Sequence, residues 1–115
     1  MLFRSDPLMD LICRLAAVGG RAVLHASGEI DLATLPLFRD QLVRAIGQNA
    51  GQLITVDLDG VTALDDTGLG ILLGAAARAR ELGGDLDVVC TNERLLARLG
   101  VTGFDRAVAV RSGLA

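Results

Sequence analysis

The chain has 115 residues, of which 51% are hydrophobic and 22% charged, so it is long enough to bury one core but hardly two. We therefore expect one domain over residues 1–115, with its core between about residue 10 and about residue 110. The formal net charge is −3, which argues against nucleic acids and anionic lipids as partners, because both bind basic surfaces.

Residues and patterns that the sequence lacks exclude further classes of protein. It contains no lysine, so neither a Schiff-base lysine nor a P-loop lysine is available. No apolar run reaches the length of a membrane span, and the first ten residues lack the pattern of a signal peptide. We expect a cytoplasmic protein without membrane insertion.

Two cysteines, Cys13 and Cys90, lie far apart without a C-x-x-C motif, and the chain has a single histidine, His25. This composition predicts no metal site and no cofactor. Reduced, buried thiols are the favoured interpretation, and a bridge between the two cysteines is the alternative, which cytosolic chains rarely use. For the isolated His25 we expect a solvated or hydrogen-bonded structural role.

The pattern along the chain begins with two β-prone runs, 11–18 and 21–27, around Gly19-Gly20. The glycine pair suits the positive φ angles of a tight turn, so the runs are expected to pair as an antiparallel hairpin. Thr34 then predicts the N-cap of a helix whose end is marked by Gly47, Asn49 and Gly51. Its inward residues recur at helical spacing: Leu35, Phe38, Leu42 and Ile46.

The middle of the chain predicts a strand over 53–58, a turn at Asp59-Gly60 and an extended run over 61–64. A second helix is expected to start at Asp65 and to end at Gly83-Gly84. Its apolar stripe consists of Leu69, Leu72, Leu73 and Ala76.

The last part of the chain predicts a strand over 86–90 and a third helix, capped by Thr91 or Asn92, with Gly100 at its left-handed C′ position. A short strand over 107–110 follows. The leucines of that helix expected to face inward are Leu95, Leu96 and Leu99. An N-terminal hairpin followed by βα units predicts an α/β fold, a small mixed β-sheet packed with α-helices, whose later strands run parallel.

The densest polar segment carries four carboxylates within ten residues: Asp57, Asp59, Asp65 and Asp66. An Asp-x-Asp-Gly sequence after an apolar strand resembles the nucleophile motif of haloacid dehalogenase-like phosphatases, with Asp57 as nucleophile and Asp59 as acid and base. That family also uses a lysine, which this chain lacks. A calcium loop is excluded, because Gly68 stands where a bidentate Glu is required. Turn positions for the first two carboxylates and helix capping by the last two are the simpler interpretation.

Four segments carry a family resemblance: Gly28-Glu29-Ile30-Asp31-Leu32-Ala33-Thr34 before the first helix, Val56-Asp57-Leu58 with Val61, Leu64-Asp65-Asp66-Thr67-Gly68-Leu69-Gly70, and Gly83-Gly84 before an apolar strand. In their order and spacing they resemble the STAS domain, and more narrowly the bacterial anti-sigma factor antagonists. The resemblance covers residues from about 10 to about 110.

The resemblance implies a protein-binding switch without catalysis. In that family the unmodified antagonist binds an anti-sigma factor, a serine kinase of the histidine-kinase-like ATPase class, and so frees a sigma factor. The kinase phosphorylates a serine at the start of the second helix, and the complex separates, because a phosphate adds about −1.5 to −2 charges to the interface. The alternative within the fold is a STAS module of another assembly, such as a stress-signalling scaffold or a transport-associated complex.

At the phosphoacceptor position of the resemblance, this chain has Asp66 in place of serine. Either its permanent charge mimics the phosphorylated state, or a partner accepts the carboxylate through an arginine and the antagonist is constitutively active. Thr67 is an alternative phosphosite, with a helix-capping hydroxyl as its structural interpretation. The resemblance implies these partner-binding residues: Glu29, Asp31, Asp65, Asp66, Thr67, Gly68 and Leu69.

Two features of the helices and the C-terminus complete the expectations. The arginines of the second and third helices are expected on solvated faces beside acidic neighbours, with a protein interface as the alternative; they are Arg78, Arg80, Arg94 and Arg98.

Members of the family often carry a further helix after the last strand, where this sequence has only residues 111–115. Exposed apolar residues at that end would favour a homodimer.

Overall fold

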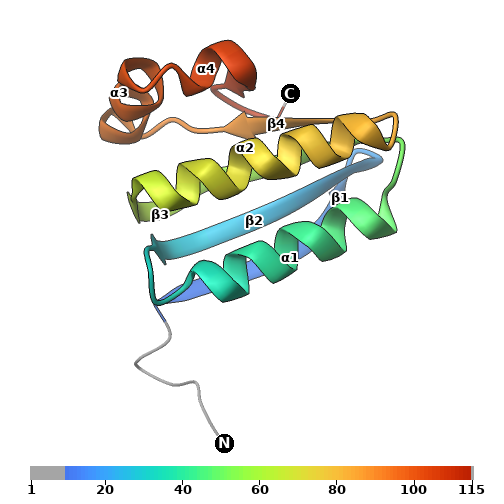
Figure 1. The fold of residues 1–115 in the computed structure, drawn as a ribbon, viewed down its shortest axis with the longest axis horizontal. Coiled ribbons are helices and arrows are strands. Elements are labelled where there is room, and N and C mark those ends of the chain that lie inside the picture. The colour runs from blue at the N-terminus through green and yellow to red at the C-terminus, as the bar shows by residue number, and fades with distance from the viewer. Residues whose placement is uncertain (1–9, 115) are drawn as a thin grey trace, which may run out of the picture.

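The computed structural model describes residues 10–114 as one five-stranded sheet with helices. In chain order the elements are β1 (Leu11–Val18), β2 (Arg21–Ile30), α1 (Leu35–Gln48), β3 (Leu53–Leu64), α2 (Asp66–Glu81), β4 (Asp85–Val89), α3 (Glu93–Val101), α4 (Phe104–Ala107) and β5 (Ala109–Arg111). Figure 1 shows α1 and α2 side by side across one face of the sheet, with α3 and α4 grouped near β4. Within the described range, no helix has the length and apolar character needed to cross a bilayer.

The strands lie in sequential order, β1-β2-β3-β4-β5. β1 pairs antiparallel with β2, and every later pair is parallel. The hairpin turn has φ angles of 58° at Gly19 and 78° at Gly20, as a tight turn of this kind requires. Each parallel step crosses over through helical chain, so the predicted α/β fold with a mixed sheet and an N-terminal hairpin is confirmed.

The core lies between the sheet and the two helices α1 and α2. The residues predicted to face inward and found buried are Phe38, Leu42, Ile46, Leu69, Leu72, Ala76, Leu95 and Leu99. Leu73 and Leu96, which the apolar pattern also places inward, are 39% and 36% exposed, so that prediction is wrong. Each directly follows a buried leucine, and consecutive helix positions point about 100° apart, so both cannot face the core.

The predicted turn at Asp59-Gly60 is also wrong, because β3 continues through these residues to Leu64. The register against β2 shifts there: His25 pairs with Asp57, whereas Ser27 pairs with Gly60. Between these pairs, one residue of β2, Ala26, lies opposite two of β3, Leu58 and Asp59, which is a β-bulge. A Cβ on Gly60 would lie 2.8 Å from the hydroxyl oxygen of Ser27, so the glycine permits the bulge and does not reverse the chain.

The helix ends differ from the sequence pattern in detail. Thr34 occupies the N-cap position of α1, but its side chain makes no capping hydrogen bond to the helix. Asn92, one of the two predicted caps, accepts hydrogen bonds from the first amides of α3. Gly100 lies inside α3, and the left-handed glycine is Gly103, with φ 78°.

The predicted last strand over 107–110 is shifted, because the short helix α4 precedes it and β5 spans Ala109–Arg111.

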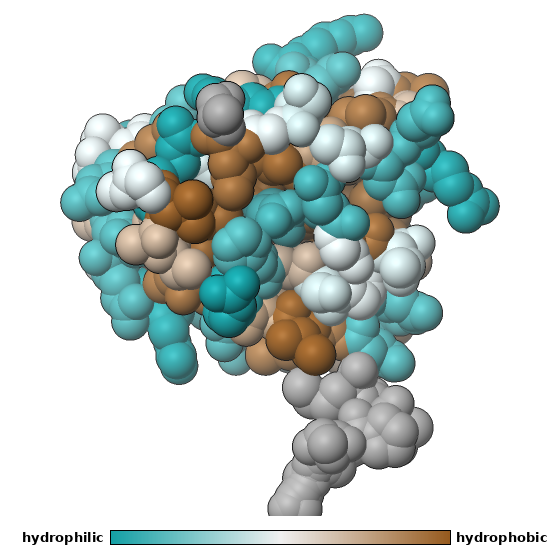
Figure 2. Space-filling model, turned by 180° about the vertical axis from the view of Figure 1, so that it is seen from behind, coloured by the Kyte–Doolittle hydropathy of each residue, from teal (hydrophilic) through white to brown (hydrophobic). Residues whose placement is uncertain are grey.

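A buried carboxylate lies on the face of the sheet away from α1 and α2, close to β5. Asp87 on β4 is 2% exposed, accepts a hydrogen bond of 2.6 Å from the Thr55 hydroxyl, and lies 2.9 Å from Nε of Arg111. Figure 2 shows this side of the molecule, where hydrophobic residues alternate with polar ones. The ion pair therefore joins β4 to β5, the strand that follows α4.

The two cysteines are free thiols on strands that are not neighbours. Cys13 lies on β1 and Cys90 directly follows β4, with β2 and β3 between them. Three strand spacings amount to roughly 14 Å, whereas a disulfide needs Cα atoms within about 7 Å. The alternative of a bridge between the two cysteines is therefore wrong for this fold, and the reduced state favoured by the sequence is the one that fits it.

Burial makes both thiols poor nucleophiles. It raises the pKa of Cys13 from 9.0 to about 11, and it also raises the pKa of Cys90. Because the thiolate is the reactive form, Cys13 of the native protein is expected to react with iodoacetamide at pH 8 about 100-fold more slowly than in the unfolded chain. Timed intact-mass spectra in buffer and in urea measure the ratio. Equal rates, or a two-dalton loss after mild oxidation, would contradict this structure.

Candidate functional site

The carboxyl ends of β2, β3 and β4 meet at one edge of the sheet, at the left in Figure 1. The backbone amide of Asp65, after β3, donates a hydrogen bond of 3.2 Å to the carbonyl oxygen of Ile30, at the end of β2. The loop after β2, the start of α2 and the α3 helix therefore border one surface. We call it the carboxyl-end surface and define it by Glu29, Asp31, Leu32, Asp65, Asp66, Thr67 and Arg98.

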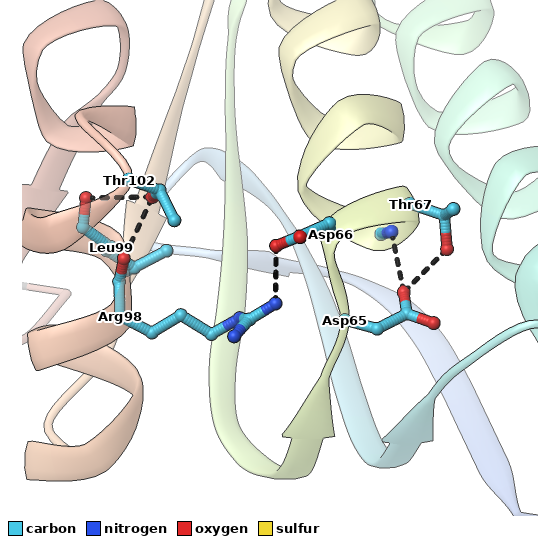
Figure 3. Close-up of polar contacts among 7 residues, drawn as sticks. Asp65, Asp66, Thr67, Arg98, Leu99 and Thr102 are labelled. Atoms are coloured by element: carbon cyan, nitrogen blue, oxygen red, sulfur yellow. Dashed lines mark hydrogen bonds and ion pairs between the residues drawn. The ribbon is translucent and has the colours of Figure 1, made fainter.

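Asp65 begins α2 as its N-cap residue, as predicted. Its backbone is extended, and its Oδ1 accepts hydrogen bonds from the Thr67 hydroxyl at 2.6 Å and from the Gly68 amide at 3.0 Å. These two bonds stabilise the ionised carboxylate and lower the pKa of Asp65, with a further contribution from the charge of Arg98. The Thr67 hydroxyl is thus held by Asp65 although Thr67 is exposed (Figure 3).

Replacing Asp65 with alanine is expected to lower the stability of the protein in a pH-dependent way. The folded-state pKa lies below the unfolded one, so the carboxylate stabilises the fold above the ordinary carboxyl pKa and loses this effect as the pH falls through the lowered value. Thermal unfolding of wild type and Asp65→Ala between pH 7 and pH 2 measures the difference, which should shrink toward low pH. A difference that grows on acidification would contradict the capping role.

Asp66 follows Asp65 at the first helical position. It is the more accessible of the two aspartates, with its side chain 85% exposed. Its Oδ1 lies 2.5 Å from Nη2 of Arg98, which reaches across from α3 (Figure 3). For Arg98 the sequence predicts a solvated face beside acidic neighbours. The acidic residue that it meets is Asp66, 32 positions away, a pairing that no local pattern indicates. Arg78 meets that expectation, because it pairs with Glu81 at 3.2 Å.

Gly68 and Leu69 are buried, so they support the carboxyl-end surface from below and do not form it. A Cβ on Gly68 would lie 2.7 Å from Cδ1 of Leu64 and 2.8 Å from Cγ2 of Ile30. The missing side chain lets the first turn of α2 pack directly on the ends of β2 and β3. This close approach sets the position of the exposed residues Asp66 and Thr67.

The loop after β2 is fixed by its own polar groups. Asp31 accepts hydrogen bonds from the amides of Ala33 at 3.0 Å and Thr34 at 3.2 Å. The Thr34 hydroxyl donates to the carbonyl oxygen of Glu29 at 2.8 Å. Between these contacts Leu32 stands 77% exposed. The sequence-based list of partner-binding residues omits Leu32, although its place directly after Asp31, outside any helical or strand periodicity, was a signal that it is not a core residue.

The carboxylates Asp57 and Asp59 are held in structural contacts. Asp57 accepts a hydrogen bond from the Asp59 amide at 2.9 Å and lies 2.8 Å from Nδ1 of His25. Asp59 accepts hydrogen bonds from the amide and the hydroxyl of Thr91, at 2.7 and 3.0 Å. The hydrogen-bonded structural role expected for His25 is confirmed. Among residues 10–114, no group of three or more His, Cys, Asp or Glu side chains is arranged to hold a metal ion.

Comparisons with known proteins agree with this architecture. The protein family described as "Mlab, STAS domain" matches residues 13–112. The chain is 32% identical over 81 residues to the anti-sigma-B factor antagonist of Bacillus subtilis (strain 168), covering 70% of this chain and 72% of that protein.

Solved structures show the same fold at lower identity. An anti-sigma factor antagonist from Mycobacterium paratuberculosis superposes with a TM-score of 0.81 at 23% identity, over 90% of this chain and 87% of that one. The anti-sigma factor antagonist SpoIIAA in its unphosphorylated form gives a TM-score of 0.71 at 19% identity, over 88% and 89% of the two chains. The family match spans nearly all of the described residues, and the chain belongs to the STAS domain family.

Proposed function

We propose that this protein is an anti-sigma factor antagonist that binds an anti-sigma factor of the histidine-kinase-like ATPase class through the carboxyl-end surface, and thereby regulates the release of a sigma factor. The names of its relatives support the activity. One structural observation carries the proposal: the exposed Asp66 and Thr67 stand at the start of α2, and the exposed Leu32 stands on the loop after β2, whose end is hydrogen-bonded to Asp65. An exposed apolar residue within a charged rim is typical of a protein-binding surface.

The proposal makes the protein a cytoplasmic binding partner and not an enzyme. Asp57 and Asp59, the pair that an aspartate-based phosphatase would need, are engaged with Thr91, His25 and each other. A phosphatase assay with Mg²⁺ and a generic phosphomonoester is expected to show no turnover. Turnover that disappears in the Asp57→Asn variant would favour the phosphatase alternative.

The proposed switch differs from its family at one residue. Asp66 stands where the resemblance puts the phosphoacceptor serine, and a carboxylate offers no hydroxyl to a kinase. Thr67 is the adjacent hydroxyl, and its hydrogen bond to Asp65 competes with phosphate transfer. We therefore propose that binding is not terminated by phosphorylation of this chain. Incubation with the purified anti-sigma factor kinase of the same organism and ATP, followed by intact mass, should show no added phosphate on wild type and one on Asp66→Ser.

Leu32 provides the most direct test of the surface. The Leu32→Ser variant removes an exposed apolar side chain and leaves the core untouched, so its thermal stability should match that of wild type. Its affinity for the purified anti-sigma factor is expected to fall by about tenfold or more, because central apolar side chains dominate interface energies.

The matched control is Val18→Ser, which removes another apolar side chain, 41% exposed, at the hairpin turn, at the opposite end of β2 from the carboxyl-end surface. This control should bind as wild type does. Equal affinities for all three proteins would place the interface elsewhere. Absence of binding by wild type and by Asp66→Ser alike would favour a STAS module of another assembly.

A further inference from the structure

The ion pair between Asp66 and Arg98 joins the start of α2 to α3 at the carboxyl-end surface. The two side chains lie 2.5 Å apart, and they differ in accessibility: the Asp66 side chain is 85% exposed and that of Arg98 37%. The carboxylate therefore faces outward, while the guanidinium reaches it from a more protected position (Figure 3).

Arg98 is held by the helix that carries it. Asn92 caps the start of α3 by accepting hydrogen bonds from the Arg94 and Leu95 amides at 2.9 and 3.2 Å. At the other end the Thr102 hydroxyl donates to the carbonyl oxygen of Arg98 at 2.8 Å. The Nε atom of Arg98 is buried and makes no hydrogen bond within residues 10–114. Asp66 is thus the polar contact that the guanidinium makes, so the pair is a defined unit of the surface.

The charge of this unit separates Asp66 from a phosphorylated serine. One carboxylate and one guanidinium carry no net charge together, and the N-terminus of α2 adds a partial positive charge near Asp66. A phosphate at the same place would carry about −1.5 to −2 charges, so one arginine would leave it negative. Asp65 keeps its own charge whichever residue stands at position 66, so a partner that rejects the phosphorylated state by charge meets no added net charge from the Asp66–Arg98 pair.

We propose that Arg98 is a specificity-determining residue of the switch: it neutralises Asp66 within the chain and so keeps the protein in its binding-competent state. This inference rests on the proposed function, and it decides between the two roles that the sequence leaves open for Asp66. The carboxylate acts as a neutralised replacement for the unmodified serine, and not as a mimic of the phosphorylated one. The arginine that accepts it comes from α3 of the same chain.

A double-mutant cycle tests the proposal, with affinities for the purified anti-sigma factor of the same organism measured by calorimetry without ATP. The proteins are wild type, Arg98→Gln, Asp66→Ala and the double variant. Arg98→Gln is expected to weaken binding by about tenfold, because it leaves a lone carboxylate to be desolvated in the interface. In the Asp66→Ala background, the same substitution should change the affinity less than about twofold. Arg98→Lys, which keeps the charge, should restore most of the affinity.

The outcomes separate the inference from the function on which it rests. Equal weakening by Arg98→Gln in both backgrounds would assign Arg98 a purely structural role and overturn the inference, as would no weakening in either. Binding by Asp66→Ala but not by wild type would also overturn it, because Asp66 would then act as a phosphate mimic; the proposed function would stand. Absence of binding by all four proteins would overturn the proposed function itself.

Discussion

Replacing Gly28 with alanine is expected to destabilise the protein by about 3–5 kcal/mol, because backbone strain and steric overlap act together at this position. Gly28 has φ +117°, a conformation that residues with a side chain rarely adopt, and an added Cβ would lie 2.0 Å from the carbonyl oxygen of Asp10. That oxygen accepts a hydrogen bond from the Glu29 amide at 2.6 Å. The glycine thus lets the start of β1 pass close to β2 directly before the loop that carries Leu32.

Urea unfolding followed by circular dichroism measures this loss of stability. Gly74→Ala is the matched control, since Gly74 lies inside α2 and nothing lies within 4 Å of its added Cβ. That substitution is expected to stabilise the protein by about 0.5–1 kcal/mol, because alanine forms helices better than glycine. A Gly28→Ala variant as stable as wild type would show that β1 does not approach β2 in this way.

The Arg111→Ala variant is expected to lose about 2–4 kcal/mol of stability, because it leaves the buried carboxylate of Asp87 without its counter-ion. The Asp87 side chain is 3% exposed, whereas that of Arg111 is 43% exposed, so water compensates for part of the loss. The Thr55 hydroxyl continues to donate to Asp87 but cannot neutralise its charge.

A second variant distinguishes this charge effect from a general weakening of β5. The second variant combines Asp87→Asn with Arg111→Ala. The side-chain amide at position 87 is neutral, and its oxygen can still accept the hydrogen bond from the Thr55 hydroxyl. Chemical unfolding should show the double variant to be more stable than Arg111→Ala alone. The single variant Asp87→Asn completes the comparison. A double variant whose loss equals the sum of the losses of Arg111→Ala and Asp87→Asn would contradict the ion-pair interpretation.

Local sequence patterns were sufficient for most elements of this fold. Glycine pairs and apolar periodicity predicted the hairpin, the parallel βα units and the N-cap of α2 at Asp65, and these are all present. The patterns were wrong where residues typical of one local structure form a different one. Asp59-Gly60 has the composition of a turn but forms a bulge, because the neighbouring strand β2 continues beside it.

The sequence predicted where α2 begins but not the contacts made there. Asp65, Asp66 and Thr67 lie where the motif indicates, whereas Gly68 and Leu69 turned out to be buried supports. Arg98 was not foreseen as the partner of Asp66, because that contact depends on where the fold places α3 relative to the start of α2 and not on spacing along the chain. Long-range ion pairs of this kind follow from tertiary structure alone.

The most direct test of the central claim is the affinity of the wild-type protein for the purified anti-sigma factor kinase of the same organism, measured by calorimetry with and without ATP. Saturable binding that persists after ATP is added is expected, since Asp66 offers no hydroxyl for phosphorylation. Failure of both wild type and Asp66→Ser to bind would contradict the claim that this protein is an anti-sigma factor antagonist.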